Sequence, residues 1–405
     1  MEKSEYDIII FALSRIDSEY SSTSICLSKE FAKTNRVFFI NHPYSIKDWF
    51  SELFKNGRLK RLGLNFFLCR NTFEQTQTPS LVSVTPPLTL PINWLPPSKL
   101  FSILNQLNNC ILQKSLKIIL KKFQVSKFIF INSYDPFFLW SFPKINQQYI
   151  RIYQSVDDIS QNSYTAKHGV MLEQKIAKNS ELVITTSLAL REKLERSNPN
   201  THIVNNAVDF LHFNQVINKK LSRPKDIFGL KSPIIGYIGN LDDSRIDFEL
   251  ILEVAKNHQD KTILLVGPIN SQSFYDLELD HVHNIVSVGS KNISQLPNYL
   301  AYMDLGLIPF KVNKLTQSIY PLKVNEYLAA GKGVISTNFS KDVTLFSDVI
   351  KISDSQKDFL DLVSDHFSEI KKDQKRITNR RLEVARSNTW EARVREIWKI
   401  IQSSH

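Results

Sequence analysis

The sequence predicts an α/β fold made of two units, each built on a doubly wound parallel sheet. The chain has 405 residues, which is more than a single hydrophobic core usually serves. Short apolar runs, typical of buried parallel strands, alternate with segments of helical periodicity. A polar stretch at residues 214–232 separates two such series and carries Lys219, Lys220, Arg223 and Lys225. We therefore place a linker there.

The first series defines a predicted domain at residues 1–213. Its expected strands are residues 7–12, 37–41, 127–132, 149–153, 182–186 and 202–206, and its expected helices are residues 21–32, 98–123, 169–178 and 187–196. Residues 42–97, with prolines at 79, 86, 87, 91, 96 and 97, are expected to form a long connection. Strands that alternate with helices in this way indicate βαβ units.

The second series defines a predicted domain at residues 233–385. Its expected strands are residues 233–239, 262–267, 285–288, 305–309 and 333–336, and its expected helices are residues 247–257, 293–301 and 322–330. Residues 386–405 are treated separately, because residues 389–401 have the pattern of an amphipathic helix. In folds of this kind, ligands bind at the carboxyl ends of the strands, so we expect a cleft between the two units.

Charge restricts the classes of partner. The net charge is +11, and residues 1–150 contribute 18 − 10 = +8 of it, with no acidic residue between Glu74 and Asp135. A basic surface attracts nucleic acid, anionic lipid or phosphorylated substrates. Because no nucleic-acid reader motif accompanies the charge, we expect no nucleic-acid binding.

The three cysteines and the chain start indicate the compartment. Cys26, Cys69 and Cys110 are scattered and odd in number, so a reducing environment is expected. The start of the chain does not resemble a signal peptide, and no apolar run approaches the roughly 20 residues of a membrane span. We expect a cytoplasmic protein, with peripheral attachment to the inner face of the membrane as a candidate. No metal spacing is visible, and no required cofactor or metal is expected.

The most informative segment is Tyr320–Tyr327. Pro321 is expected at the first helical position, which leaves the amides of Leu322 and Lys323 free to bind a phosphate. Lys323 adds positive charge there, and Glu326 lies about one turn later, where its carboxylate can accept hydrogen bonds from a ribose diol. The alternative is an ordinary helix in which Glu326 is a solvated surface residue.

A second candidate segment is the glycine turn after the strand at residues 233–239. Gly239 lets the backbone approach a ligand closely, Asn240 follows it, and Arg245 can face a diphosphate. The alternative is a plain turn between a strand and a helix.

Three carboxylates are candidates for catalysis. Asp157 and Asp158 follow the strand at residues 149–153, and their adjacent charges can raise one pKa and make a proton acceptor. Asp135 follows the strand at residues 127–132 and is a parallel candidate. The alternatives are helix capping for the pair and a turn opening for Asp135.

The helix at residues 98–123 is a candidate membrane-facing element. Its apolar stripe is expected at Leu100, Ile103, Leu104, Leu107, Ile111 and Leu112, followed by Lys114, Lys117, Lys121 and Lys122. A nearby segment adds Trp49, Phe50, Phe54, Lys55, Arg58, Lys60 and Arg61. The alternative is a core helix whose basic end complements its dipole.

Four motifs in this order resemble one enzyme family. Residues 203–213 resemble its I-P-N-G-V-D signature, and residues 235–240 resemble the start of its donor domain. Residues 264–268 are similar to its L-x-x-V-G-x strand, which includes Gly267, and residues 321–332 are similar to P-L-K-x-x-E-Y-L-A-x-G-K. Together they resemble the retaining glycosyltransferases of family four, which have the GT-B fold.

The resemblance implies two Rossmann-like domains facing a cleft, with a nucleotide-diphosphate sugar (UDP-, GDP- or dTDP-linked) in the second and the acceptor in the first. It implies donor contacts at Gly239, Asn240, Arg245, Gly267, Ser318, Tyr320, Pro321, Leu322, Lys323 and Glu326. It also implies a last helix that crosses back to the first domain. Ser318 stands where many members have a sugar-contacting Glu, and Asn240 stands where a basic residue is usual.

The expected function is therefore transfer of a sugar, with retention, to a glycan or lipid-linked acceptor. Val156-Asp157-Asp158 is similar to a motif of members that build cell-surface polysaccharides. A nucleotide-sugar epimerase or phosphorylase of the same fold is the enzymatic alternative, and acceptor-independent conversion of the donor would favour it. A non-catalytic partner protein is the other alternative, and nucleotide binding without turnover would favour that. The sequence leaves the oligomeric state open.

Overall fold

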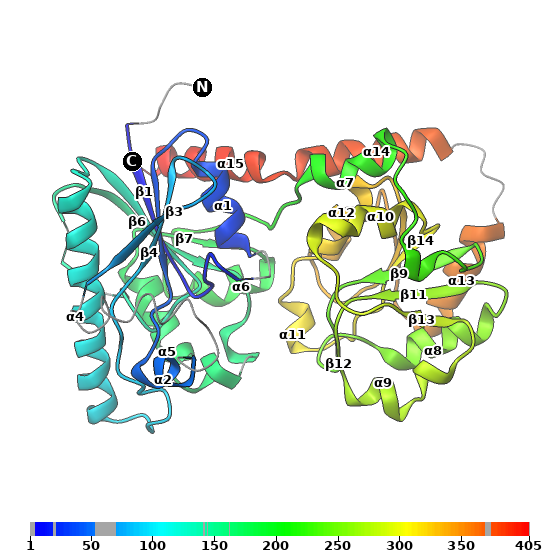
Figure 1. The fold of residues 1–405 in the computed structure, drawn as a ribbon, viewed down its shortest axis with the longest axis horizontal. Helices are drawn as coiled ribbons and strands as arrows, with labels where there is room; N and C mark the ends of the chain where they lie inside the picture. The colour runs from blue at the N-terminus through cyan, green and yellow to red at the C-terminus, as the bar shows by residue number, and fades with distance from the viewer. Residues whose placement is uncertain are drawn as a thin grey trace. The chain divides into compact units, whose positions relative to one another are not determined.

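The computed structural model describes residues 5–18, 22–52, 70–140, 142–143, 145–161, 163–368 and 374–404. Its contacts divide the chain into two compact units, described here one at a time (Figure 1). Unit 1 comprises Met1–Val204 and Val394–His405, and unit 2 comprises Asn205–Arg393. Residues 205–213, placed in the first domain by the sequence, group with unit 2 because helix α7 (Phe210–Asn218) packs against α10 (Leu296–Ala301) and α12 (Leu322–Ala329). The same helix occupies the first part of the predicted linker.

Unit 1 contains an eight-stranded sheet in the order β3-β4-β2-β1-β5-β6-β7-β8. All neighbouring pairs are parallel except β3 with β4. The strands are β1 (Asp7–Ala12), β2 (Val37–Asn41), β3 (Thr72–Gln75), β4 (Leu81–Thr85), β5 (Phe128–Ser133), β6 (Gln148–Ser155), β7 (Leu182–Thr185) and β8 (Thr201–Ile203). The connection expected at residues 42–97 therefore includes two strands.

The order of strands reverses at β1, which has β2 on one side and β5 on the other. Such a switch point opens a crevice at the carboxyl ends of the flanking strands. The central strands are rich in β-branched and aromatic residues, and every residue of β2 and β5 is buried. This apolar composition fits strands covered on both faces.

Within the described residues, unit 1 has five helices and most of a sixth: α1 (Thr23–Phe31), α2 (Ile46–Glu52), α4 (Lys99–Lys122), α5 (Ser163–Asn179), α6 (Leu188–Leu194) and α15 (Trp390–Ser403). Ser22, Ser98 and Ser187 cap α1, α4 and α6, since each side chain accepts a backbone N–H of the first turn. α15 packs on this unit, with the Trp398 ring 6.2 Å from the rings of both Tyr6 and Phe31.

The apolar stripe expected on α4 divides between two faces. Leu112 is buried and Leu104 and Ile111 are half-buried, but Leu100, Ile103 and Leu107 are exposed. Trp49 is buried, so it does not join an outward-facing patch, whereas Phe50 is exposed. The other proposed members, Phe54, Lys55, Arg58, Lys60 and Arg61, lie outside the described residues.

Unit 2 contains a six-stranded parallel sheet in the order β13-β11-β9-β14-β15-β16 and a small β10-β12 pair. The strands are β9 (Ile234–Ile238), β10 (Leu241–Asp242), β11 (Thr262–Val266), β12 (Ile269–Asn270), β13 (Ile285–Ser287), β14 (Leu305–Ile308), β15 (Gly333–Thr337) and β16 (Lys351–Ser353). Here the order reverses at β9, so the carboxyl ends of β9 and β14 flank the switch point.

The helices of unit 2 surround this sheet (Figure 1). Besides α7, α10 and α12 they are α8 (Phe248–Asn257), α9 (Gln272–Asp276), α11 (Lys314–Gln317), α13 (Gln356–Ser368) and α14 (Gln374–Ser387). Short 3-10 turns include η1 (Ile159–Gln161) in unit 1 and η2 (Lys225–Ile227) and η4 (Ile293–Gln295) in unit 2.

One side chain fixes α12 on the sheet of unit 2. The pairing of β9 with β14 ends at Gly236, so the buried N–H of Ile238 lacks a partner strand on that side. It donates instead to Tyr327 Oη at 2.9 Å. The Tyr327 ring is fully buried, and a Cβ at Gly306 of β14 would stand 2.9 Å from it. Residue 306 must therefore be small for α12 to seat.

We predict that Tyr327→Phe lowers the free energy of unfolding by about 1–3 kcal/mol, because the Ile238 N–H is left buried without an acceptor. Urea unfolding of the full chain measures this. Tyr275→Phe is the matched control: that side chain is 52% exposed, so we expect a change within about 0.5 kcal/mol. Equal effects of the two substitutions would contradict the role given to the Tyr327 hydroxyl.

Candidate functional site

Three glycine turns lie side by side at the carboxyl edge of the unit 2 sheet. Gly239 follows β9 and Gly267 follows β11, and Gly289 lies just beyond β13. The Gly239 N–H donates to Val266 O at 2.9 Å, and the Gly267 N–H donates to Gly289 O at 3.0 Å. A Cβ at Gly267 would stand 1.8 Å from Gly239 O, so only glycine permits this approach. The turn at Gly239 thereby places half-buried backbone, without a side chain, at the switch point.

Arg245 and Asn240, both predicted donor contacts, are held by one carboxylate. Arg245 pairs with Asp242 at 3.0 Å, and Asn240 Nδ2 donates to the same Asp242 Oδ2 at 3.1 Å. Asn270 Nδ2 in turn donates to Asn240 Oδ1 at 2.8 Å. The Arg245 side chain is 36% exposed, so its charge is reachable but partly neutralised. Asp242 was absent from the predicted site.

The start of α12 differs from the prediction in two details. Pro321 is the N-cap and not the first helical residue, and the helix begins at Leu322. The Leu322 amide is not free, because it donates to Tyr320 O at 2.8 Å. No described residue accepts from the Lys323 amide, which therefore remains the open donor at this helix end. The tight turn at Tyr320–Leu322 accounts for the difference.

Glu326 is buried, with only 7% of its surface exposed, so the alternative of a solvated surface residue is wrong. Its Oε2 accepts from Lys323 Nζ at 2.7 Å. Its Oε1 receives no hydrogen bond from a described residue, yet it is not among the fully enclosed polar atoms. The result is a fixed carboxylate with one open acceptor oxygen, on the first turns of a helix beside a lysine.

Ser318 and Tyr320 precede this helix and are both nearly buried. Ser318 Oγ donates to Leu315 O at 2.7 Å, within its own turn. Tyr320 Oη accepts from Asn325 Nδ2 at 3.1 Å. These bonds hold both side chains within the local fold. Neither residue supplies a carboxylate in place of the Glu that many members of the resembling family have at position 318.

In unit 1, Asp135 is part of a pair that the sequence did not single out. His42 follows β2, Asp135 follows β5, and His42 Nδ1 lies 2.6 Å from Asp135 Oδ2. The Asp135 side chain is fully buried, while the His42 side chain is 18% exposed. The pair spans the switch point at β1. The signal in the sequence was a histidine directly after a buried strand, at Asn41-His42-Pro43.

The loop after β5 holds Asp135 rigidly. Tyr134 and Leu139 both have positive φ, 61° and 53°, which non-glycine residues seldom adopt. Asp135 N donates to Asn132 Oδ1 at 3.1 Å, and Asp135 Oδ1 accepts from Phe137 N at 3.0 Å. Asp135 therefore shapes its own turn and also fixes His42 Nδ1, which leaves His42 Nε2 without a described hydrogen-bond partner.

Asp158 is engaged in a half-buried ionic network. It accepts from Ser160 N at 3.0 Å, which caps η1, and from Lys193 Nζ at 2.8 Å. Burial works to raise the pKa of Asp158, but the bonds from Lys193 and Ser160 outweigh it and hold the pKa below its usual value. The capping alternative thus describes Asp158. Asp157, its neighbour, is half-buried at the end of β6.

The same lysine reaches a second carboxylate. Lys193 Nζ lies 3.1 Å from Glu173 Oε2, and Glu173 Oε1 accepts from Tyr153 Oη and Ser155 Oγ, each at 3.0 Å. Burial raises the pKa of Glu173 above its usual value in spite of Lys193. The network joins β6, α5 and α6 beneath Asp158.

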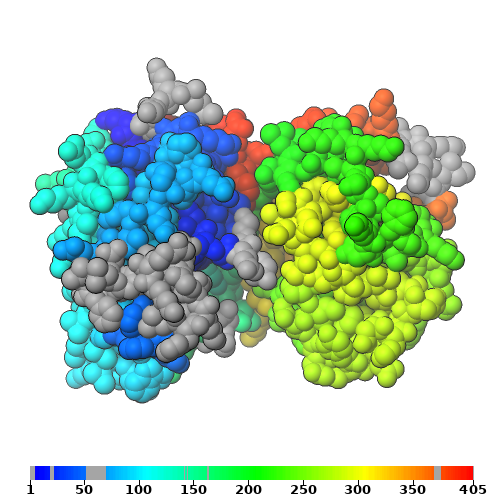
Figure 2. Space-filling model, viewed as in Figure 1, coloured from blue at the N-terminus to red at the C-terminus, as the bar shows by residue number. Residues whose placement is uncertain are grey.

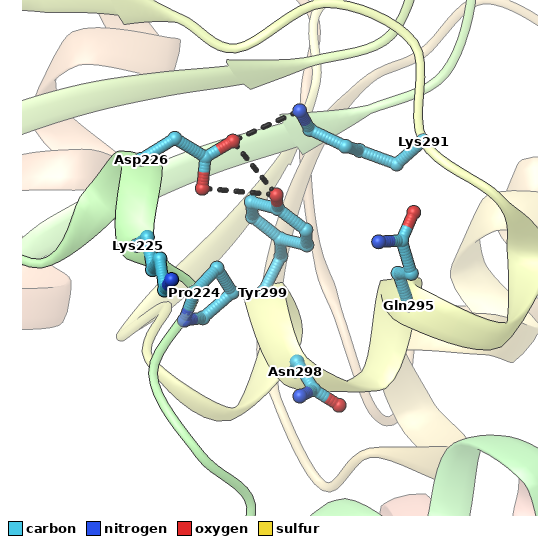
Figure 3. Close-up of a pocket in the computed structure, with 7 residues that line it drawn as sticks. All are labelled: Pro224, Lys225, Asp226, Lys291, Gln295, Asn298 and Tyr299. Atoms are coloured by element: carbon cyan, nitrogen blue, oxygen red, sulfur yellow. Dashed lines mark hydrogen bonds and ion pairs between the residues drawn. The ribbon is translucent and has the colours of Figure 1, made fainter.

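A pocket of 410 Å³ lies elsewhere on unit 2, between η2 and α10 (Figure 3). Asp226 pairs with Lys291 at 2.8 Å and accepts from Tyr299 Oη at 2.8 Å. Asp226 and Lys291 therefore neutralise one another. No predicted donor residue is among those described as lining it: Pro224, Lys225, Asp226, Lys291, Gln295, Asn298 and Tyr299.

No group of three or more His, Cys, Asp or Glu side chains among the described residues is placed to hold a metal ion. Within the same residues, no helix combines the length and apolar character that crossing a bilayer requires.

Comparison with known proteins gives one sequence relative. No family model matches the chain. "Putative teichuronic acid biosynthesis glycosyltransferase TuaH" of Bacillus subtilis (strain 168) is 32% identical over 148 residues. The matched region spans 36% of this chain and 36% of that protein's length.

Solved structures match the whole chain. The alpha,alpha-trehalose-phosphate synthase (UDP-forming) of Burkholderia vietnamiensis has a TM-score of 0.69 at 8% identity, over 99% of both chains. The sucrose-phosphate synthase of Thermosynechococcus elongatus has 0.61 at 14%, over 98% of both. Anabaena HepE, in complex with UDP and glucose, has 0.59 at 12%, over 96% of this chain and 99% of its own. The fold is GT-B, with two Rossmann-like α/β sheets. This confirms the predicted fold class.

We predict that Lys193→Met destabilises the chain by about 2 kcal/mol, because Glu173 loses its counter-charge. The loss is smaller than for a fully buried pair, because Lys193 is partly exposed to solvent. The pKa of Glu173, already raised by burial, rises further in this variant. The folded state then binds more protons than the unfolded state, so stability falls as pH rises. The loss should be larger at about pH 8 than at about pH 5. Urea unfolding at the two pH values measures it.

The double variant Lys193→Met/Glu173→Gln is the control, since it removes both charges. We expect it to recover part of the lost stability and to lose the added pH dependence. If the two substitutions are simply additive at both pH values, the proposed coupling is wrong.

Proposed function

We propose that this protein is a glycosyltransferase that moves a sugar from a nucleotide-diphosphate sugar to a glycan or lipid-linked acceptor with retention, in cell-surface polysaccharide biosynthesis. In this proposal unit 2 binds the donor and unit 1 binds the acceptor. No metal ion is assigned a role.

The observation that carries the proposal is the state of Glu326. Burying a carboxylate is costly unless its hydrogen bonds are satisfied, yet Glu326 keeps one oxygen open. A pair of neighbouring hydroxyls, as on a ribose, would complete its bonding. Lys323 fixes the other oxygen, so the acceptor atom is oriented before a ligand arrives.

The surrounding groups suit a diphosphate. The N–H of Lys323 is an available donor at the start of a helix. The side chains of Lys323 and Arg245 supply positive charge on the same unit. In glycosyl transfer the bond from the anomeric carbon to the diphosphate oxygen breaks, and a bond to the acceptor oxygen forms. Negative charge grows on the departing diphosphate, and preoriented donors stabilise it most at that moment. The backbone turn at Gly239 allows close approach.

For the acceptor we propose His42 as the residue that receives its hydroxyl. Asp135 accepts a hydrogen bond from Nδ1, which leaves Nε2 as a lone-pair acceptor for a hydroxyl proton. Asp157, half-buried beyond β6, is retained as a second acceptor-side candidate. Asp158 is assigned a structural role, because Lys193 and Ser160 already occupy it.

The names and ligands of the similar proteins support the proposed donor class and the proposed pathway. The Anabaena structure contains UDP and glucose, and the Burkholderia enzyme is described as UDP-forming. The Bacillus relative carries a name from teichuronic acid biosynthesis. UDP is accordingly the first nucleotide to test.

We predict that Glu326→Gln weakens UDP binding by about 10-fold to 100-fold, because a charged acceptor is lost from a nearly buried position. Isothermal titration with UDP and with UDP-glucose measures the change. GDP and dTDP should be titrated in parallel, since the base is not fixed by these contacts.

Glu249→Gln is the matched control, because Glu249 is an exposed carboxylate on α8 of the same unit. It should leave the affinity unchanged. Equal affinity of the Glu326 variant and the parent for every nucleotide would remove the ribose role. Conversion of a UDP-sugar without any acceptor would favour an epimerase instead.

A further inference from the structure

The outward side of α4 carries a regular row of exposed side chains. They are Leu100, Ile103, Leu107, Cys110, Lys114, Lys117 and Lys121, spaced alternately by three and four residues. This spacing keeps them on one side of the helix. The opposite side packs into the core of unit 1 through Phe101, Leu112, Leu116 and Ile119. The row is therefore available on a helix that is otherwise firmly anchored.

The row changes character along the helix axis. Its first three members are apolar and 54%, 60% and 51% exposed. Its last three members are lysines, and none of them forms an ion pair with a described residue. The helix contains no acidic residue at all. At 1.5 Å per residue the apolar members span about 10 Å, and the row as a whole spans about 32 Å.

The apolar end of α4 lies at the edge of the sheet where unit 1 has its candidate site. α4 ends at Lys122, and β5 begins at Phe128, so the basic end of the helix lies at the amino edge of the strands. The first turn lies at the carboxyl edge, where the Phe101 ring stacks on His168 of α5 at 3.7 Å. α5 itself follows the carboxyl end of β6. In Figure 2, the first half of α4, in the colour that the bar gives for its residue numbers, lies at the surface of unit 1.

We propose that the outer face of α4, defined by these seven residues, docks on an anionic lipid bilayer. The apolar end enters the boundary between headgroups and acyl chains, and the lysines rest on anionic headgroups. Because polarity changes along the axis, the helix docks tilted, with its first turns deepest. The carboxyl edge of the unit 1 sheet then faces the lipid. This inference does not depend on the proposed transfer reaction.

The charges decide against a second copy of this chain as the occupant. A paired helix needs apolar residues along the whole row, as in a coiled coil. Here a parallel partner would set lysine against lysine, and an antiparallel partner would set lysine against leucine. An anionic surface instead neutralises the lysines without any further residue. Trp94, 72% exposed four residues before the Ser98 cap, extends the apolar end.

The test is co-sedimentation of the full chain with phosphatidylglycerol–phosphatidylcholine vesicles, with pure phosphatidylcholine vesicles in parallel. We expect salt-sensitive binding to the anionic vesicles alone, together with a blue shift of Trp94 fluorescence that Trp94→Phe abolishes. Lys114→Glu/Lys117→Glu/Lys121→Glu should weaken binding by about 100-fold or more. Leu100→Gln/Ile103→Gln/Leu107→Gln should weaken it by about 10-fold or more. These side chains are exposed, so circular dichroism and unfolding should stay as in the parent.

The matched control is Lys351→Glu/Lys357→Glu/Lys375→Glu, three exposed lysines of unit 2. Both lysine variants have a formal net charge of 11 − 6 = +5. An equal loss in the control would overturn the proposal, because the binding would then follow net charge alone. Equal binding to neutral vesicles, or no vesicle binding, would also overturn it. A dimer that the apolar triple variant abolishes, without vesicle binding, would assign the face to self-association. UDP titration of each variant keeps this outcome separate from the donor-site proposal.

Discussion

The hydrogen bond from Ile238 N–H to Tyr327 Oη fixes the geometry on which unit 2 depends. It satisfies a strand amide at the point where β9 and β14 part, and it seats α12 against that opening. Lys323 and Glu326 stand on the same helix, so their distance from the Gly239 turn is set by this bond and by the absence of a side chain at Gly306. A helix start alone would not position them. The buried phenol makes the helix a rigid part of the sheet edge.

Much of this architecture follows from the sequence. Runs such as residues 8–12 and 263–266 are apolar throughout, which fits strands that are buried on both faces. The place of Glu326 on the first turns of α12 was also predictable, since its spacing from Pro321 is local. The hydrogen bond from the Leu322 amide to Tyr320 O could not be predicted, because such a tight turn depends on the exact backbone dihedral angles. The His42–Asp135 pair joins residues 93 positions apart. The place of His42 directly after a buried strand is a local signal, but no pattern in a single sequence pairs it with Asp135.

The helix at residues 98–123 shows a different limit. Its apolar residues were assigned to one stripe, and the structure divides them between a core side and an outer side. The periodicity of apolar residues predicts which sides of a helix are apolar. Where two sides are apolar, only the tertiary fold determines which of them is buried. The same applies to Asp158, whose pairing with Lys193 depends on where α6 lies.

The pairing of Arg245 with Asp242 has a consequence for any anion that reaches this edge. Asp242 competes with an incoming anion for Arg245. The guanidinium is already paired with Asp242 before a ligand arrives, so the ligand must replace the carboxylate as its partner. A group with a single diffuse charge gains little from that exchange, whereas a dense multiple charge gains more. In the proposed donor site, Asp242 would therefore favour a diphosphate over small, singly charged anions.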